Sequence, residues 1–204
     1  MPRVAKVREY SQAAPCGYFG RGRPDFTRAL LRVVKSSSML IYQGKVFSVR
    51  RHRAVEPGGV NVVREVVHHR GSAVILPRLT DGRILLIRQF RLAAGRSLWE
   101  LPAGCLDPGE TALQAARREL IEETGYRASC WKKLLEFYPS PGFVDEKMTL
   151  FLAEGAQPGP ARPETDERIL VQRFSVPQLQ RMIGNKKILD GKTLAGLLYF
   201  FSLP

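Results

Sequence analysis

The hydrophobic pattern divides the chain into a β-rich segment and a mixed α/β segment. Residues 36–70 carry short runs of β-branched and aromatic residues that are separated by turns containing Gly. These runs, at 39–42, 45–50, 53–55 and 62–67, predict a small antiparallel β lobe. Two nearly continuous apolar runs follow at 73–77 and 84–88, which is typical of strands that are buried on both faces.

The segment 112–124 favours a helix, because Ala, Leu, Gln, Arg and Glu fill it and neither Gly nor Pro interrupts it. Thr111 can cap its start, and Gly125 is placed to end it. With 3.6 residues per turn, Glu119, Glu122 and Glu123 share one face. Carboxylates at this spacing repel one another. A cation bound among them explains the pattern better than the alternative, a solvated acidic face.

Further elements follow the helix. Residues 131–137, 147–154 and 168–176 have the pattern of strands, and residues 177–183 and 193–201 have the spacing of helices with one apolar side. A proline-rich loop at 157–164 leads into an acidic run. The sequence therefore predicts an α/β fold with strands and helices mixed along the chain.

The acidic helix lies in a longer pattern, Gly104-x5-Glu110-x7-Arg118-Glu119-Leu120-Ile121-Glu122-Glu123. This stretch resembles the Nudix box, the loop–helix–loop signature of the Nudix hydrolases, and it matches every fixed position without a gap. The resemblance implies an α/β/α sandwich around a mixed sheet. It also implies hydrolysis of a nucleoside diphosphate that is linked to a further group.

The same resemblance assigns roles near the box. Glu119, Glu123 and the backbone carbonyl of Ala103 would hold the divalent metal, and Glu122 would complete the cluster. Oxygen ligands without a Cys or His suit Mg²⁺ or Mn²⁺ rather than zinc. We interpret Arg118 as a tether that pairs with Glu110, rather than as a phosphate ligand.

Other residues resemble the ADP-ribose pyrophosphatase branch of this family. Pro141 lies sixteen residues beyond Gly125, inside Ser-Pro-Gly, and Gly142 follows it. Arg91 ends a Gln-Phe-Arg run, and an arginine at a strand end can clamp phosphate; the alternative is an ordinary surface arginine. In that branch the β lobe exchanges between the subunits of a homodimer, and the stretch matching Arg64 and Glu65 reaches the partner's nucleotide.

The acidic run 164–167 follows the proline-rich loop. By resemblance we assign Glu164 as the general base and Glu167 or Asp166 as an accessory metal ligand. An ordinary solvated acidic turn is the alternative, and the choice of base among these three residues stays open. The three histidines receive no catalytic role, because their spacing gives them no partner.

The net charge of +13 raises the question of nucleic acid. Eight Arg and Lys residues against two acidic residues lie in residues 1–35, which we interpret as a basic N-terminal arm; a targeting segment is the alternative. Elsewhere the basic residues are scattered, without the aromatic interleaving that stacks bases. A basic surface equally suits a polyanionic small molecule, so nucleic acid is the weaker interpretation.

Composition fits a cytoplasmic protein. No apolar run approaches the length that spans a bilayer. The three cysteines are an odd number without metal-ligand spacing, which indicates reduced thiols. Cys105 lies at a variable box position and is expected to be filler.

These observations predict a basic arm at 1–35, a dimerising β lobe at 36–70 and a Nudix hydrolase domain at 71–204. The predicted reaction is Mg²⁺-dependent hydrolysis of ADP-ribose to AMP and ribose 5-phosphate. Three alternatives stay open: another nucleotide sugar such as GDP-mannose, a dinucleotide polyphosphate, or a Nudix-like regulator that binds a ligand without hydrolysis. Such regulators typically lose box carboxylates, and this chain keeps all of them.

Overall fold

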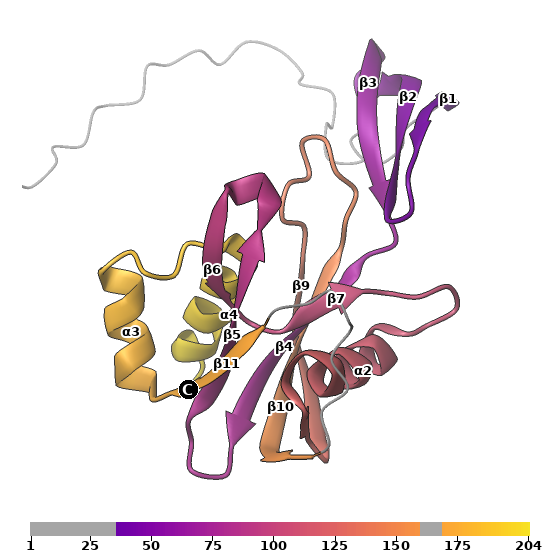
Figure 1. The fold of residues 1–204 in the computed structure, drawn as a ribbon. Helices are drawn as coiled ribbons and strands as arrows, with labels where there is room; N and C mark the ends of the chain where they lie inside the picture. Colours follow the sequence, from indigo (N-terminus) through magenta and orange to yellow (C-terminus); the bar gives the residue numbers. More distant parts are fainter. Residues whose placement is uncertain (1–35, 160–168) are drawn as a thin grey trace, which may run out of the picture.

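The structure, a computed structural model, describes residues 36–159 and 169–204 (Figure 1). The predicted basic arm and the three acidic candidates Glu164, Asp166 and Glu167 lie outside the described residues. Within the described part of the chain, no helix is both long and apolar enough to cross a membrane.

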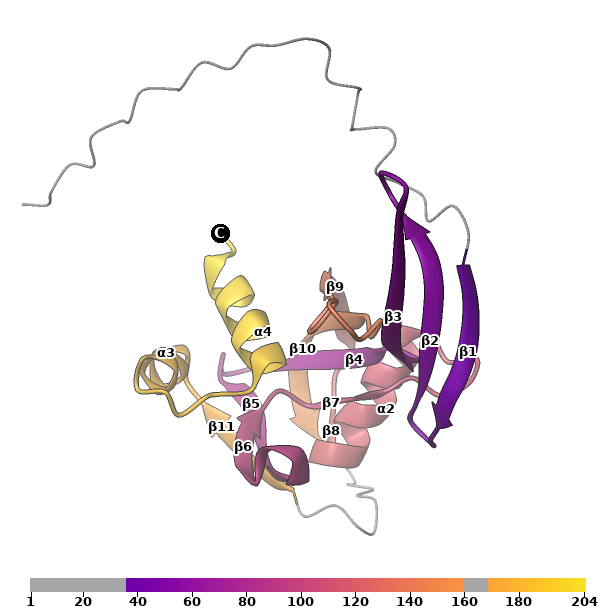
Figure 2. The same cartoon turned by 90° about the horizontal axis from the view of Figure 1, so that it is seen from above.

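The predicted β lobe is a three-stranded antiparallel sheet that stands apart from the rest of the molecule (Figures 1 and 2). Its strands are β1 (Ser36–Gln43), β2 (Phe47–Glu56) and β3 (Val60–His69). The two strands predicted at 45–50 and 53–55 are in fact one strand. The basic stretch between them does not interrupt β2, because every residue of that strand pairs with β3 and the polar side chains can face water.

The second sheet is mixed and has eight strands. They are β4 (Ser72–Leu79), β5 (Ile84–Arg91), β6 (Arg96–Glu100), β7 (Ala103–Cys105), β8 (Tyr126–Arg127), β9 (Cys130–Phe137), β10 (Met148–Pro158) and β11 (Leu170–Phe174). A short 3-10 turn, η1 (Leu92–Ala94), joins β5 to β6. The order is β11-β5-β4-β10-β8, and β10 runs parallel to β4 at its centre.

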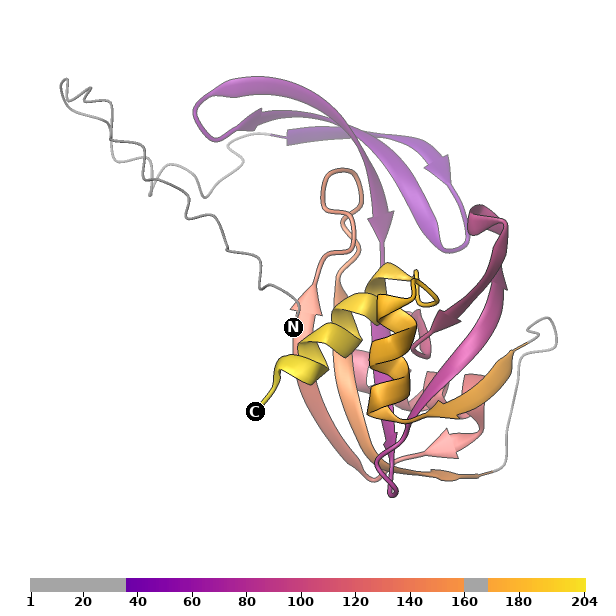
Figure 3. The ribbon, with the colours of Figure 1, turned by 90° about the vertical axis from the view of Figure 1, so that its left-hand side faces the viewer.

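Helices cover both faces of this sheet. The helix α2 (Ala112–Thr124) packs on one face, while α3 (Val176–Gly184) and α4 (Gly191–Ser202) pack on the other (Figures 2 and 3). Alternate residues of β4 serve the two sides: Ile75 packs with Leu120 of α2, and Leu76 packs with Leu197 of α4. The predicted α/β/α sandwich, with β4 buried on both faces, is confirmed.

Two boundaries after the acidic helix differ from the prediction. The strand β10 continues to Pro158 and takes in the first residues of the predicted loop. The last strand ends at Phe174, before Val176, because Ser175 caps α3 and forms a capping box with Gln178.

Candidate active site

The acidic helix has the predicted bounds, and local interactions fix both of its ends. The hydroxyl of Thr111 accepts a hydrogen bond from the backbone N–H of Gln114, whose side chain binds back to Thr111. At the other end Gly125 takes a left-handed conformation, with φ of 70°, and its N–H binds the carbonyl of Ile121. Local sequence signals therefore fix where this helix begins and where it ends.

Two of the three glutamates on its functional face lie against β7. The carboxylate of Glu119 covers Gly104 so closely that a Cβ atom on Gly104 would stand 1.9 Å from Oε1. Glu123 is 7 % exposed, and its Oε2 accepts a hydrogen bond of 2.9 Å from the N–H of Ala103. The residue types at 103, 104, 119 and 123 thus create a narrow contact between strand and helix that places carboxylate oxygens beside the Ala103 backbone.

Arg118 joins the box loop to this acidic face. Its Nε and Nη2 donate to Glu110 at 3.1 and 2.9 Å, so the predicted pair is present. The contact goes further than predicted: Nη1 also donates to Glu119 at 2.6 Å and Glu122 at 2.9 Å. Because of the hydrogen bond from Arg118, the pKa of the Glu110 carboxyl lies below its usual value. The same pairing raises the pKa of Arg118, which stays charged.

The donor set suits a hard divalent cation that is bound only partly by protein. Among residues 36–159 and 169–204, no group of three or more His, Cys, Asp or Glu side chains converges as a complete metal cage. Mg²⁺ does not need such a cage, because it is commonly held by one or two carboxylates together with waters and substrate phosphates. Glu119, against Gly104, and Glu123, on the Ala103 N–H, share one helix face and match that requirement.

A second charged group joins the ends of β5 and β6 to the start of α4. Arg91, at the end of β5, donates from Nε to Glu100 Oε1 at 2.9 Å and from Nη2 to Oε2 at 2.8 Å. Lys192 of α4 also binds Glu100. Burial alone would raise the pKa of the Glu100 carboxyl, but Arg91 and Lys192 together bring that pKa below its usual value.

Sequence reasoning missed Glu100 and Lys192, although Arg91 was a candidate. One signal was available for Glu100, since it is a charged residue at the end of the apolar run before Leu101-Pro102. No local pattern marks Lys192, because it lies 92 residues from Glu100 in the sequence.

The Ser-Pro-Gly loop is fixed to the β lobe. Pro141 and Gly142 are exposed between β9 and β10. Val67 of β3 forms an isolated bridge with Val144 and accepts a hydrogen bond from the N–H of Asp145 at 3.1 Å. The Asp145 side chain binds His68 Nδ1 at 2.6 Å, and His68 in turn lies 2.8 Å from His52. The structure therefore gives these two histidines a partner that spacing alone did not reveal.

Arg64 and Glu65 are exposed on β3 and pair within the lobe. Arg64 donates to Glu56 at 3.3 Å, and Arg51 donates to Glu65 at 3.0 Å. Neither of these pairs connects Arg64 or Glu65 to Glu119 or Glu123. Their predicted contact with the nucleotide of a partner subunit stays a prediction.

Comparison with known proteins points to one family. Residues 67–195 match the NUDIX domain. The chain is 37 % identical to an ADP-ribose pyrophosphatase of Mycobacterium tuberculosis over 166 residues, which cover 79 % of this chain and 80 % of the relative. It is 36 % identical to a GDP-mannose pyrophosphatase of Escherichia coli over 152 residues, or 66 % of this chain and 79 % of the relative.

The fold is also shared with a solved structure. The crystal structure of an ADP compounds hydrolase superposes with a TM-score of 0.70 over 83 % of this chain and 91 % of the other, at 21 % identity.

Proposed function

The chain belongs to the Nudix family and is a Nudix pyrophosphatase, and from that premise we propose that it hydrolyses ADP-ribose to AMP and ribose 5-phosphate. The relatives support hydrolysis of the diphosphate in a nucleotide sugar. One observation carries the proposal: Glu119 and Glu123, on the acidic face of α2, lie against Gly104 and Ala103, where a diphosphate and its cation can be held together.

We assign the cation site to Glu119, Glu123 and the Ala103 carbonyl, with Glu122 beside them. Nudix hydrolases generally use divalent metal ions, and Mg²⁺ is our proposal for this chain because the donors are oxygen atoms. When bound, the ion supplies charge neutralisation at the diphosphate and lowers the pKa of an attacking water. Arg118 holds Glu110, Glu119 and Glu122 and so fixes the acidic face against the box loop.

Arg91 is proposed to bind the diphosphate. Glu100 takes up Nε and Nη2 of its guanidinium, so Nη1 is the nitrogen that remains for a phosphate oxygen. The Arg91 side chain is 39 % exposed, whereas that of Glu100 is 1 % exposed, so a substrate can approach the arginine and not the carboxylate. Glu164 stays our proposal for the general base.

Pro141 and Gly142 support the choice of ADP-ribose within the family. They occupy an exposed loop that is held on β3 by Val67 and His68. The loop thus has a fixed position next to the lobe that carries Arg64 and Glu65. We propose that loop and lobe together contact the nucleotide.

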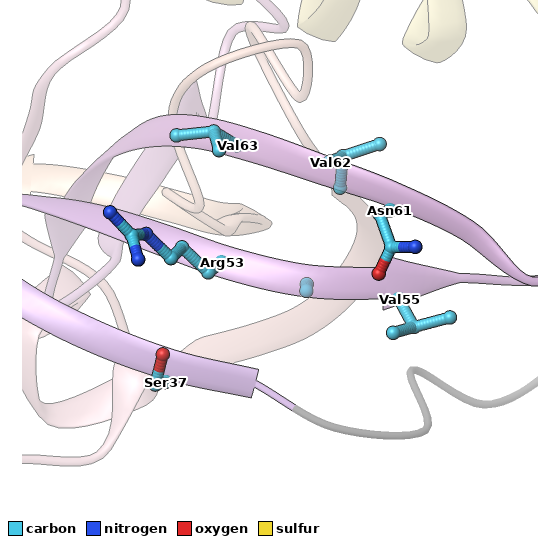
Figure 4. Close-up of a pocket in the computed structure, with 7 residues that line it drawn as sticks. Ser37, Arg53, Val55, Asn61, Val62 and Val63 are labelled. Carbon is cyan, nitrogen blue, oxygen red and sulfur yellow. The ribbon is translucent and has the colours of Figure 1, made fainter.

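We also propose that the lobe pairs with a second copy of the chain. Its apolar side chains are unusually exposed: Met39 is 55 % exposed, Tyr42 54 % and Val63 56 %. A hollow of about 470 Å³ lies across its three strands (Figure 4). The hollow is lined by Ser37, Arg53, Ala54, Val55, Asn61, Val62 and Val63. Apolar surface of this kind marks interaction sites in proteins.

A substrate panel tests the proposed reaction. ADP-ribose, GDP-mannose and a dinucleotide polyphosphate are each incubated with the protein and Mg²⁺, and the products are identified. We expect ADP-ribose to give the highest kcat/KM, with AMP and ribose 5-phosphate as products. A clear preference for GDP-mannose, favoured by the Escherichia coli relative, would replace the proposed substrate. Turnover of none of the compounds would contradict the proposal.

A further inference from the structure

Four charged side chains, at the ends of β5 and β6 and at the start of α4, form one network of ion pairs. Glu100 at the end of β6 is fully buried. It binds Arg91 of β5 and Lys192 of α4, and Lys192 also donates to Asp190 at 3.1 Å. The group holds two cations and two anions, so it carries no net charge. Buried charges are stable only when they are paired in this way.

The start of α4 is fixed firmly enough to hold Lys192 in place. Asp190 caps the helix and accepts hydrogen bonds from Thr193 N–H at 3.0 Å and from its hydroxyl at 2.6 Å. The Thr193 oxygen in turn accepts a hydrogen bond of 2.7 Å from the N–H of Leu101, two residues before Ala103. The Lys192 side chain is 10 % exposed. Lys192 is thus held at the start of α4, beside the strand end that leads to Ala103.

Arg91 also interacts electrostatically with Glu123 of α2. Its pKa is raised first by the hydrogen bonds to Glu100, and the carboxylates of Glu123 and Asp190 also contribute. Arg91 is therefore hydrogen-bonded to Glu100 and is also influenced by the charge of Glu123. How much of its positive charge reaches a substrate depends on how Glu100 is compensated.

We propose that Lys192 is a positioning residue for the pyrophosphatase reaction, which acts by sharing the buried carboxylate of Glu100 with Arg91. With Lys192 present, the negative charge of Glu100 is balanced from two sides, and Arg91 keeps positive charge to offer to the diphosphate. Without Lys192, Arg91 alone compensates Glu100, and its own charge is largely cancelled. The inference rests on the proposed function, in which Arg91 meets the substrate.

Four variants test this role. Lys192→Met removes the charge, Lys192→Gln keeps a hydrogen-bond donor without charge, and Lys192→Arg keeps the charge. Lys187→Met is the control, since Lys187 is exposed on the connection between α3 and α4. With ADP-ribose as substrate, we expect kcat/KM to fall about tenfold in the Met and Gln variants, mainly through KM. The Arg and control variants are expected to stay within about twofold of the wild type.

The pH dependence of kcat/KM distinguishes the proposed role of Lys192 from a merely structural one. Arg91 and Lys192 are the charged groups that bind Glu100, and Asp190 in turn binds Lys192. Loss of Lys192 raises the pKa of Glu100, so Glu100 is protonated at a higher pH. A protonated Glu100 no longer cancels the charge of Arg91, so the deficit in kcat/KM of the Met and Gln variants should shrink as the pH falls. The Arg variant should follow the wild type at every pH.

A binding measurement separates this inference from the proposed substrate. Calorimetry with inorganic pyrophosphate and Mg²⁺ needs no turnover, and about tenfold weaker binding is expected in the two uncharged variants alone. If the wild type hydrolyses no nucleotide sugar, the proposed function fails while this titration still decides the role of Lys192. If Lys192→Met does not fold, the Gln and Arg variants decide it. Equal binding by all variants, or no binding by the wild type, overturns the inference, as do folded uncharged variants with unchanged kcat/KM and pH profile.

Discussion

At the scale of single residues, the contact between Glu119 and Gly104 decides where the Glu119 carboxylate lies, which we propose as a metal ligand. Gly104 is needed for space and not for backbone freedom, because the close approach is to a side chain. A glycine at this box position therefore has a local reason in this chain. Any side chain at 104 would occupy the place of the Glu119 carboxylate.

Gly104→Ala should consequently reduce activity without unfolding the protein. Glu119 ends in a flexible carboxylate that can turn away from the new methyl group, so stability should change little. Displacement of this carboxylate is expected to lower kcat by about a hundredfold. Steady-state kinetics and thermal unfolding provide the check. Gly184→Ala is the matched control, because nothing lies within 4 Å of a Cβ there; equal activity of both variants would refute the role of Gly104.

The contacts of individual residues could be predicted from the sequence where those contacts are local. The helix 112–124, its cap Thr111 and the Arg118–Glu110 pair all lie within one continuous stretch of the sequence, and the structure has them. The contacts of Glu100 with Lys192 and of His68 with Asp145 join residues 92 and 77 positions apart. No periodicity connects such residues, so only the three-dimensional fold reveals their pairing.

At the scale of elements, Arg118 and Glu110 tie the box loop to the start of α2. The folded pKa of Glu110 lies below its ordinary value of 4.5, and the cause is the hydrogen bond from Arg118. The unfolded state therefore binds more protons than the folded state as the pH falls through this range. The Arg118–Glu110 pair stabilises the folded protein at pH values above the ordinary pKa of the carboxyl group. This stabilisation is lost as the pH falls through the lowered pKa of Glu110.

Glu110→Gln should lower the melting temperature at pH 7, and this difference from the wild type should shrink as the pH falls through the lowered pKa of the Glu110 carboxyl. The measurement is thermal unfolding of both proteins across this pH range. A difference between wild type and variant that is independent of pH would show that the charge of Glu110 does not stabilise the fold. Glu154→Gln, which removes an exposed partner of Arg78 on β10, controls for general loss of a surface charge.

Element boundaries were predictable only as far as the competing local signals agreed. The two strands predicted at 45–50 and 53–55 are one, because pairing with β3 outweighs the low strand preference of the Arg- and His-rich junction. Likewise, Ser175 and Gln178 form a capping box that starts α3 at Val176, so the strand ends at Phe174, two residues before its predicted end.

At the scale of the whole molecule, the exposed lobe is the feature that the single chain leaves unexplained. The lobe is joined to the Ser-Pro-Gly loop at the end of β3, where the backbone of Val67 bonds to Phe143 and Asp145. A second copy would cover the surface and would place Arg64 and Glu65 near another subunit. The predicted dimer is our proposal on this ground.

Val63→Glu tests the dimer directly. The substitution places a charge on the apolar side of the lobe hollow, and burial of an unpaired charge at an interface is strongly unfavourable. Sedimentation should show a dimer for the wild type and a monomer for the variant. The control is Leu189→Glu, at an exposed leucine between α3 and α4. A wild-type monomer, or a dimer that Val63→Glu leaves intact, would contradict the proposal.

The central claim is that the acidic face of α2 holds the divalent ion with which a diphosphate is cleaved. Its most direct test is the Mg²⁺ dependence of ADP-ribose hydrolysis by the wild type, Glu123→Gln and the control Glu154→Gln. We predict Mg²⁺-dependent turnover that falls by about a hundredfold or more in Glu123→Gln, with the fold intact, and is unchanged in the control. Full activity of Glu123→Gln at the same Mg²⁺ concentration would contradict the account.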